Sequence, residues 1–222
     1  MKMMNKHVEN TYYQIDNTLQ MLFKQGFLRE YRKVEYRSNG NKEILAWSNH
    51  IPGRQNSGDY FTRIGQYIYI YENGAFHGII NDGSIIRVSF TFQKNILMYQ
   101  SLLYWPAPII IPEQDIEELG IREAMQIYLN SLNCDTKELR MRSPFRYDYD
   151  CDYNSEDHPS THIHMQHYKS RIRTNKPICF NTFIKFIIKY FYPTIPLDLR
   201  NYESMHYSFY SLDKGRTAII NI

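Results

Sequence analysis

The sequence predicts an α+β fold, in which a curved, mostly antiparallel sheet forms a meander and helices pack on one of its faces. Between residues 43 and 104 the chain holds short runs that are rich in β-branched and aromatic residues. Asn73-Gly74 and Asp82-Gly83 lie between neighbouring runs, as expected of two-residue hairpin turns. Apolar residues recur at helical spacing before and after this centre, which separates helices from strands along the chain.

The first predicted element is a helix over residues 8–25. Ile15, Leu19 and Leu22 recur at helical spacing, and Gly26 is a typical helix stop. Trp105-Pro-Ala-Pro ends the sheet that follows, because proline cannot donate a ladder hydrogen bond. Six strands are expected between the helix and these prolines: Glu43–Trp47, Tyr60–Ile64, Tyr67–Tyr71, Phe76–Ile80, Ile85–Phe92 and Ile96–Tyr104.

Two more helices and two extended segments are predicted in the second half of the chain. Pro112 precedes a helix over residues 113–133. The segments Arg142–Tyr149 and Thr161–Tyr168 have the composition of strands. A last helix is predicted between Pro177 and Pro193. Three of its apolar residues are expected to be buried against the sheet: Phe183, Phe186 and Ile187.

The chain is expected to form a single domain over residues 1–222, since this length suits one sizeable core. An N-terminal helical segment covers residues 1–40, and the sheet-rich core covers residues 41–176. The C-terminal helix and tail cover residues 177–222. The pattern after residue 202 favours neither helix nor strand.

The composition is typical of a soluble globular protein, with 43% hydrophobic and 22% charged residues. The net charge of +3 is mild and does not by itself indicate a nucleic-acid partner. Three cysteines without CxxC spacing argue against a disulfide framework. No apolar run is long enough to span a bilayer. We therefore expect a cytoplasmic protein without a membrane partner.

Ionisable residues are most concentrated between Arg146 and His164. His162 and His164 share one face if their segment is a strand, and His158 completes a set of three imidazoles. Such a set holds a transition metal or, with Asp148 orienting a histidine, performs acid–base chemistry. A solvated strand face beside an exposed acidic loop is the structural alternative.

Basic residues lie on both sides of this stretch. Arg142 precedes it, and Lys169, Arg171 and Arg173 follow it at strand alternation, so that they would form a basic stripe. Such a stripe suits an anionic substrate, such as RNA or a nucleotide. The alternative is a set of charges that protect a sheet edge from pairing.

With these residues in view, the chain resembles a bacterial family of small cytosolic proteins of unknown function. The resemblance covers most of residues 58–193. It is carried by six segments: Gly58-Asp-Tyr60, Asp82-Gly-Ser-Ile85, Leu103-Tyr-Trp-Pro106, Met141-Arg-Ser-Pro-Phe-Arg-Tyr-Asp148, His158-Pro-x-x-His162-x-His164, and the helix Phe183-x-x-Phe186-Ile187 ending in Phe191-Tyr-Pro193.

The order of a sheet, Arg-Tyr-Asp and a closing His-x-His is also similar to toxins of the TumE type in bacterial toxin–antitoxin modules. That resemblance implies functional roles for Arg146, Asp148, His158, His162 and His164. The chain differs from those toxins in its extra terminal segments and in the acidic insertion before His158.

The leading hypothesis is a cytoplasmic toxin or phage-defence protein that acts on RNA or another nucleic acid as an RNase-like phosphodiesterase, with an antitoxin or defence protein as partner. His162 or His164 would accept a proton, another imidazole would donate one, and Arg146 would stabilise charge on the phosphate. No cofactor is required in this reading. The alternatives are a non-catalytic partner-binding subunit and a hydrolase that holds zinc or manganese on His158, His162 and His164.

Overall fold

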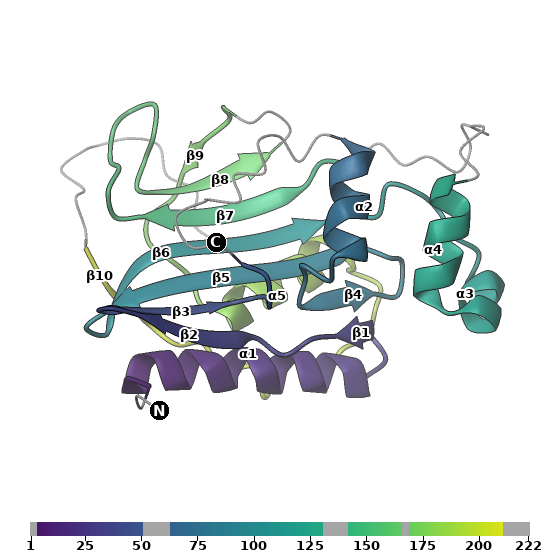
Figure 1. The fold of residues 1–222 in the computed structure, drawn as a ribbon, viewed down its shortest axis with the longest axis horizontal. Coiled ribbons are helices and arrows are strands. Elements are labelled where there is room, and N and C mark those ends of the chain that lie inside the picture. Colours follow the sequence, from purple (N-terminus) through teal and green to yellow (C-terminus); the bar gives the residue numbers. More distant parts are fainter. Residues whose placement is uncertain (1–3, 51–62, 131–141, 166–168, 211–222) are drawn as a thin grey trace.

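The computed structural model describes residues 4–50, 63–130, 142–165 and 169–210, which form an open sheet with helices packed against it (Figure 1). The helices are α1 (Lys6–Lys24), α2 (Ile64–Glu72), α3 (Glu113–Leu119), α4 (Ile121–Asn130) and α5 (Phe180–Phe191). The strands are β1 (Leu28–Tyr31), β2 (Glu35–Asn39), β3 (Lys42–Ala46), β4 (Gly78–Ile80), β5 (Ile85–Gln93), β6 (Ile96–Trp105), β7 (Phe145–Asp150), β8 (Thr161–Met165), β9 (Ile172–Arg173) and β10 (Ser208–Phe209).

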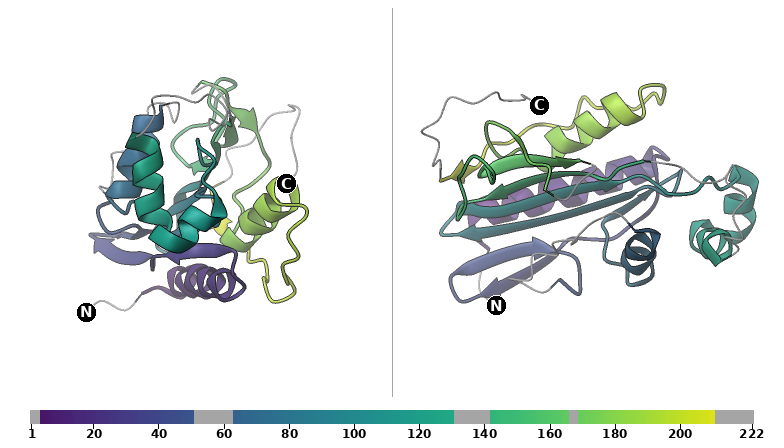
Figure 2. Two further views of the ribbon diagram at one scale, coloured as in Figure 1. Left: turned by 90° about the vertical axis from the view of Figure 1, so that its right-hand side faces the viewer. Right: turned by 90° about the horizontal axis from the view of Figure 1, so that it is seen from above.

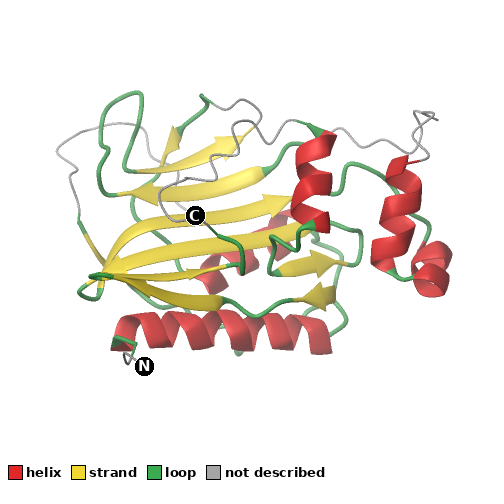
Figure 3. Ribbon diagram, in the orientation of Figure 1, coloured by secondary structure: helices red, strands yellow, loops and turns green. Residues whose placement is uncertain are grey.

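The long hairpin of β5 and β6 is the centre of the sheet (Figure 3). On one side, β7, β8 and β9 follow β6 in sequence order. On the other side, β3 and β4 both pair with β5, and they are bordered by β2 and β1. Within the described residues every pairing is antiparallel except that of β10, which runs parallel to the start of β6 at Ile96 and Leu97. The predicted α+β class with a mostly antiparallel sheet is confirmed.

One face of the sheet carries the larger apolar core, covered by α1 and α5 (Figure 2). The buried stripe of α1 contains Val8, Ile15, Leu19 and Leu22. Alternate residues of the central strands point toward these helices, because successive side chains of a strand project to opposite faces. The strand residues in this core include Val88, Phe90, Leu102, Tyr104, Phe145, Tyr147, Tyr149 and Ile163.

A smaller apolar cluster forms where α2 packs on the opposite face, next to α3 and α4. Tyr67 of α2 is fully buried there, and its hydroxyl donates a hydrogen bond to the carbonyl of Gly83. Leu103 and Trp105 of β6 supply the sheet side of this cluster. The expectation that helices pack on one face therefore describes α1 and α5, whereas α2 covers the other face at one end of the sheet.

One of the six predicted strands was misassigned, and another falls largely outside the described residues. Tyr67–Tyr71 lies within α2, and Asn73-Gly74 ends that helix instead of forming a hairpin, with Gly74 at φ 60°. Tyr67, Ile70 and Tyr71 are buried by tertiary packing, which overrides the modest local preference of this run for strand, whereas Tyr69 is exposed. Residues 60–62 of the predicted strand Tyr60–Ile64 lie outside the described residues, and Ile64 begins α2.

The region between the first helix and residue 43 was also incompletely predicted. Residues 28–39 form β1 and β2, although the sequence indicated only a helical segment up to residue 40. The predicted helix over residues 113–133 is divided into α3 and α4 by Gly120, whose φ of 78° is incompatible with a continuous α-helix. Its last three residues lie outside the described part of the chain.

Most of the remaining elements agree with the prediction to within a few residues. Helix α1, strands β3, β5 and β6 and helix α5 all form where they were expected, and Asp82-Gly83 forms the turn between β4 and β5. Phe183 and Ile187 are fully buried in α5, as predicted. Phe186 is only partly buried, because it lies at the edge of the helix face and packs its ring against Phe145, with the ring centroids 4.9 Å apart.

Within the described residues, no helix combines the length and the apolar composition needed to cross a membrane.

Candidate functional site

Strands β7 and β8 bring four predicted site residues together. Three aromatic side chains of β7 point into the larger core, so Arg146 and Asp148 project from the opposite face. The antiparallel register places Arg146 directly across from His164, and Asp148 directly across from His162. We call these four residues the His–Asp cluster.

The side chains of the His–Asp cluster are in direct contact. Arg146 Nε donates a hydrogen bond to Asp148 Oδ2 over 2.6 Å, and His164 Nε2 lies 3.4 Å from the same oxygen. The Nε2 atoms of His162 and His164 are 2.9 Å apart. The other carboxylate oxygen, Asp148 Oδ1, is buried, and the hydroxyl of Ser101, directly across on β6, also interacts with this carboxylate. Four polar side chains therefore meet on this face of the sheet.

The tautomer of His162 follows from its surroundings. Its Nδ1 lies 2.7 Å from the carbonyl oxygen of Pro159. A carbonyl only accepts hydrogen bonds, so Nδ1 carries the proton and donates it. In the neutral ring, Nε2 then keeps its lone pair and directs it toward His164 and Asp148.

Asp148 is ionised at neutral pH. Burial alone would raise the pKa of this carboxyl group, but the Arg146 guanidinium and then the imidazoles of His164 and His162 bring the pKa below its usual value. A carboxylate with little exposure is stabilised here by the guanidinium beside it.

Both imidazoles of the cluster are uncharged at neutral pH. Burial is the main cause that lowers the pKa of His162 to about 4, and the carboxylate of Asp148 acts in the opposite direction. Burial and then Arg146 lower the pKa of His164 to about 3. A neutral imidazole keeps one nitrogen lone pair, which can accept a proton or bind a metal ion.

Arg87 is a site residue that sequence reasoning missed. In the row of directly paired residues that crosses β5 to β8, Arg87 is followed by Leu103, Arg146 and His164, so all four side chains lie on the same face. Its guanidinium stacks on Trp47 at 4.5 Å and is only 7% exposed. Burial and then Arg146 lower its pKa to about 9, which leaves it charged at neutral pH. An arginine inside an otherwise apolar strand was the available signal.

The loop between β7 and β8 brings His158 to the cluster. The His158 ring lies 5.1 Å from the ring of His162 and stacks on Tyr153, which is 51% exposed. Arg173 holds this loop by donating hydrogen bonds to Asn154 Oδ1 at 3.2 Å and to the Ser155 carbonyl at 3.0 Å. The predicted acidic loop therefore borders the site.

Lys169, Arg171 and Arg173 do not form the basic stripe that a single strand would give. Lys169 and Arg171 precede β9, which is only two residues long, so strand alternation cannot align them with Arg173. Arg171 is close enough to lower the pKa of His158, after burial as the larger cause. Arg142 pairs with Asp82, 3.8 Å away at the turn between β4 and β5, instead of a cluster residue.

The residues suited to a metal ion also differ from the expected set. Asp148, His162 and His164 each offer one ligand atom, and these atoms all lie within 4.8 Å of one another. Asp148 takes the place that the sequence suggested for His158, because the register of β7 against β8 brings the carboxylate to the two imidazoles.

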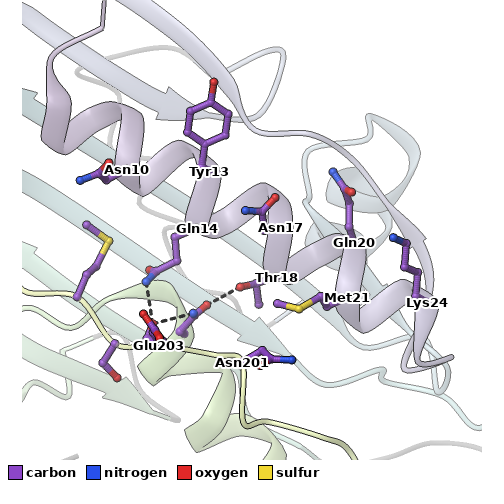
Figure 4. A pocket seen from close by; sticks show the side chains of 13 residues that line it. Asn10, Tyr13, Gln14, Asn17, Thr18, Gln20, Met21, Lys24, Asn201 and Glu203 are labelled. Carbon is purple, nitrogen blue, oxygen red and sulfur yellow. Dashed lines mark hydrogen bonds between the residues drawn. The ribbon is translucent and has the colours of Figure 1, made fainter.

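A separate cavity of about 620 Å³ lies on the helix-covered side of the fold (Figure 4). It is formed by α1 and residues 201–205, and its lining is rich in amide side chains, among them Gln14, Asn17 and Asn181. None of the residues of the His–Asp cluster lines it. The His–Asp cluster and this cavity therefore lie at two different places on the molecule.

Comparison with known proteins found one family. A family model described as "Uncharacterized conserved protein (DUF2290)" matches residues 27–214. No curated protein and no solved structure matches the chain.

Proposed function

The chain belongs to this family of uncharacterised conserved proteins, and from that premise we propose that it is an RNase-like phosphodiesterase that acts on nucleic acid at the His–Asp cluster. The observation that carries the proposal is the contact between Asp148, His162 and His164 within a group of arginines. Phosphodiester cleavage requires such a combination, because an attacking oxygen must be activated and the phosphate charge must be stabilised.

The arginines supply the charge that a phosphate needs. Arg146 lies within the cluster, Arg87 follows it in the same row of the sheet, and Arg171 is close to His158 and His164. A guanidinium presents its donors in a planar fork that matches the oxygens of a phosphate group. We assign phosphate binding to Arg146 and Arg171, which are more exposed than Arg87.

Activation of the attacking oxygen is assigned to Asp148, His162 and His164, either directly through an imidazole or through an ion that they hold. The exposed ring of Tyr153, stacked on His158 at the border of the site, offers a face on which a base can stack. A single-stranded substrate suits this arrangement, because its bases are free to leave the stack.

The resemblance to TumE-type toxins supports a biological role in a bacterial toxin–antitoxin module or in phage defence. A toxin of this kind acts in the cytoplasm and requires a partner protein that restrains it. The acidic loop that borders the site is where such a partner would control access, since it lies beside His158.

Cleavage of labelled RNA and DNA oligonucleotides by the purified chain tests the proposal. Asp148→Asn and His164→Ala are expected to lower the cleavage rate at least a hundredfold, on the order of the contribution of acid–base groups. His206→Ala is the matched control, because this histidine is exposed and lies outside the cluster. Absence of cleavage by the wild type, or equal rates in all four proteins, contradicts the proposal.

Induced expression in bacteria tests the biological role. Growth arrest by the wild type that His164→Ala relieves, while His206→Ala does not, supports a toxic activity of the cluster. Growth arrest that persists in His164→Ala favours the alternative of a non-catalytic subunit that binds a partner protein.

A further inference from the structure

We propose that Asp148, His162 and His164 hold a divalent transition-metal ion, with zinc or manganese as the expected occupants. The inference deepens the proposed phosphodiesterase function, and the catalytic meaning of the ion rests on it. Metal binding itself is measured without any assumption about catalysis.

The separations between the donor atoms fit a metal centre. A metal bound at about 2.0–2.1 Å by nitrogen or oxygen requires neighbouring ligand atoms about 2.9–3.4 Å apart for angles between the octahedral and the tetrahedral value. The two imidazole Nε2 atoms are 2.9 Å apart, and His164 Nε2 lies 3.4 Å from Asp148 Oδ2. All three ligand atoms lie within 4.8 Å of one another, so the remaining pair, His162 Nε2 and the Asp148 carboxylate, is the one that would have to adjust on binding an ion.

The groups around the ligands orient them as in known metal centres. A histidine ligand usually donates its remaining N–H to a backbone carbonyl or carboxylate, and His162 donates Nδ1–H to Pro159. A ligating carboxylate is usually hydrogen-bonded in turn, and Asp148 accepts from Arg146. These contacts leave Nε2 of His162 facing His164, and they leave Asp148 Oδ2 within 3.4 Å of His164 Nε2.

A proton count explains why an ion suits this point better than a hydrogen-bond network. Arg146 Nε–H already serves Asp148 Oδ2, so within the cluster the proton on His164 Nε2 is left for both the lone pair of His162 Nε2 and the carboxylate. One proton cannot be shared equally between an imidazole lone pair and a carboxylate oxygen. A divalent cation interacts with all of these lone pairs at once.

The ligand types indicate which metal binds. Two imidazoles and one carboxylate favour zinc, manganese or iron over calcium and magnesium, which prefer oxygen ligands. Three protein ligands leave a coordination position open, as in catalytic zinc sites. The nearby Arg146 and Arg171 repel a cation, but the Asp148 carboxylate and the phosphate of the proposed substrate offset that repulsion.

The experiment measures metal binding to the full chain after treatment with EDTA and dialysis. Isothermal titration with Zn²⁺ and with Mn²⁺ gives the stoichiometry and affinity, and mass spectrometry of the purified protein gives its metal content. We expect one ion per chain in the wild type and in the control His206→Ala. Asp148→Asn and His164→Ala are expected to lose at least tenfold in affinity.

Co²⁺ spectroscopy of the wild type and of His164→Cys tests metal coordination directly, so that a loss of stability in Asp148→Asn or His164→Ala does not decide the outcome. Co²⁺ in the wild-type site should give visible absorption bands without a sulfur contribution. In His164→Cys the introduced thiolate should add a ligand-to-metal band in the near ultraviolet, because it would coordinate the ion directly. Absence of Zn²⁺ and Mn²⁺ binding by the wild type, or equal binding by the ligand variants, overturns the inference.

The outcome for the metal site is separable from that for the proposed function. Metal binding that depends on Asp148 and His164, without cleavage of any polynucleotide, upholds the site and counts against the phosphodiesterase. Cleavage by a wild-type protein that binds no metal upholds the phosphodiesterase and overturns the site.

Discussion

Truncating Phe183 to alanine tests how helix α5 is held on the sheet that carries the His–Asp cluster. The Phe183 ring has no solvent exposure and stacks on the ring of Phe145 in β7, with the centroids 6.1 Å apart. Two residues of the same helix provide graded comparisons. Phe186 is partly buried, and Tyr190 is 59% exposed.

The expected losses in the free energy of unfolding follow from this burial. Removing a fully buried phenylalanine ring costs about 3–5 kcal/mol, since both the transfer energy and a cavity contribute. Phe186→Ala should cost about 1–3 kcal/mol, and Tyr190→Ala less than about 1 kcal/mol. At roughly 2–4 °C per kcal/mol for a chain of this size, the melting temperature should fall by about 6–20 °C in Phe183→Ala.

Urea unfolding followed by circular dichroism measures these differences as shifts of the midpoint at constant slope. The order Phe183, Phe186, Tyr190 is the informative result. A loss below about 1 kcal/mol for Phe183→Ala, or equal losses for Phe183→Ala and Tyr190→Ala, would refute the packing described for α5.

Three further predictions concern other parts of the fold. Gly83→Ala should destabilise the protein by about 1–3 kcal/mol in thermal unfolding. Gly83 has φ 85°, and an added Cβ would lie 2.5 Å from the terminal methyl group of Met125 in α4. Gly65→Ala is the control, because a Cβ added there in α2 meets no other atom within 4 Å. The buried ring of His77 has its pKa lowered to about 3, by burial and then by nearby charged and titratable groups, so stability should fall as pH decreases from 6.5 toward 3. His77→Gln should reduce that slope, measured by urea unfolding at several pH values, by about 1.4 kcal/mol per pH unit; an unchanged slope contradicts this. Arg173→Ala should speed proteolysis in the loop between β7 and β8, whereas Arg200→Ala, which removes an exposed ion pair, should not.

Local patterns predicted much of the sheet and the shared face of His162 and His164. Residue alternation along a strand depends only on the backbone of that strand, so the side of each residue can be inferred without knowing its neighbours. Local patterns failed for Tyr67–Tyr71, which was predicted as a strand and lies in α2. A short apolar run is equally compatible with a buried strand and a buried helix, and only its packing against Trp105 and its neighbours decides between them.

The composition of the His–Asp cluster depended on strand register. The sequence placed Arg146, Asp148 and the histidines in one region, but it gave no basis for pairing Asp148 with His162 or Arg146 with His164. A shift of one residue would turn one strand's residues to the other face. Burial of the aromatic residues of β7 in the larger core selects the observed register, since the shift would expose them.

By itself, therefore, the sequence determined the fold class, the strands with clear alternation and the region in which the ionisable residues gather. The tertiary structure decided that Asp148 joins the two imidazoles, that Arg87 lies in the same row, and that Arg173 holds the loop instead of forming a basic stripe. The physical reason is that contacts close in sequence set the secondary structure and the side of a strand to which each residue projects. Contacts across strands form only when the whole sheet has buried its apolar face.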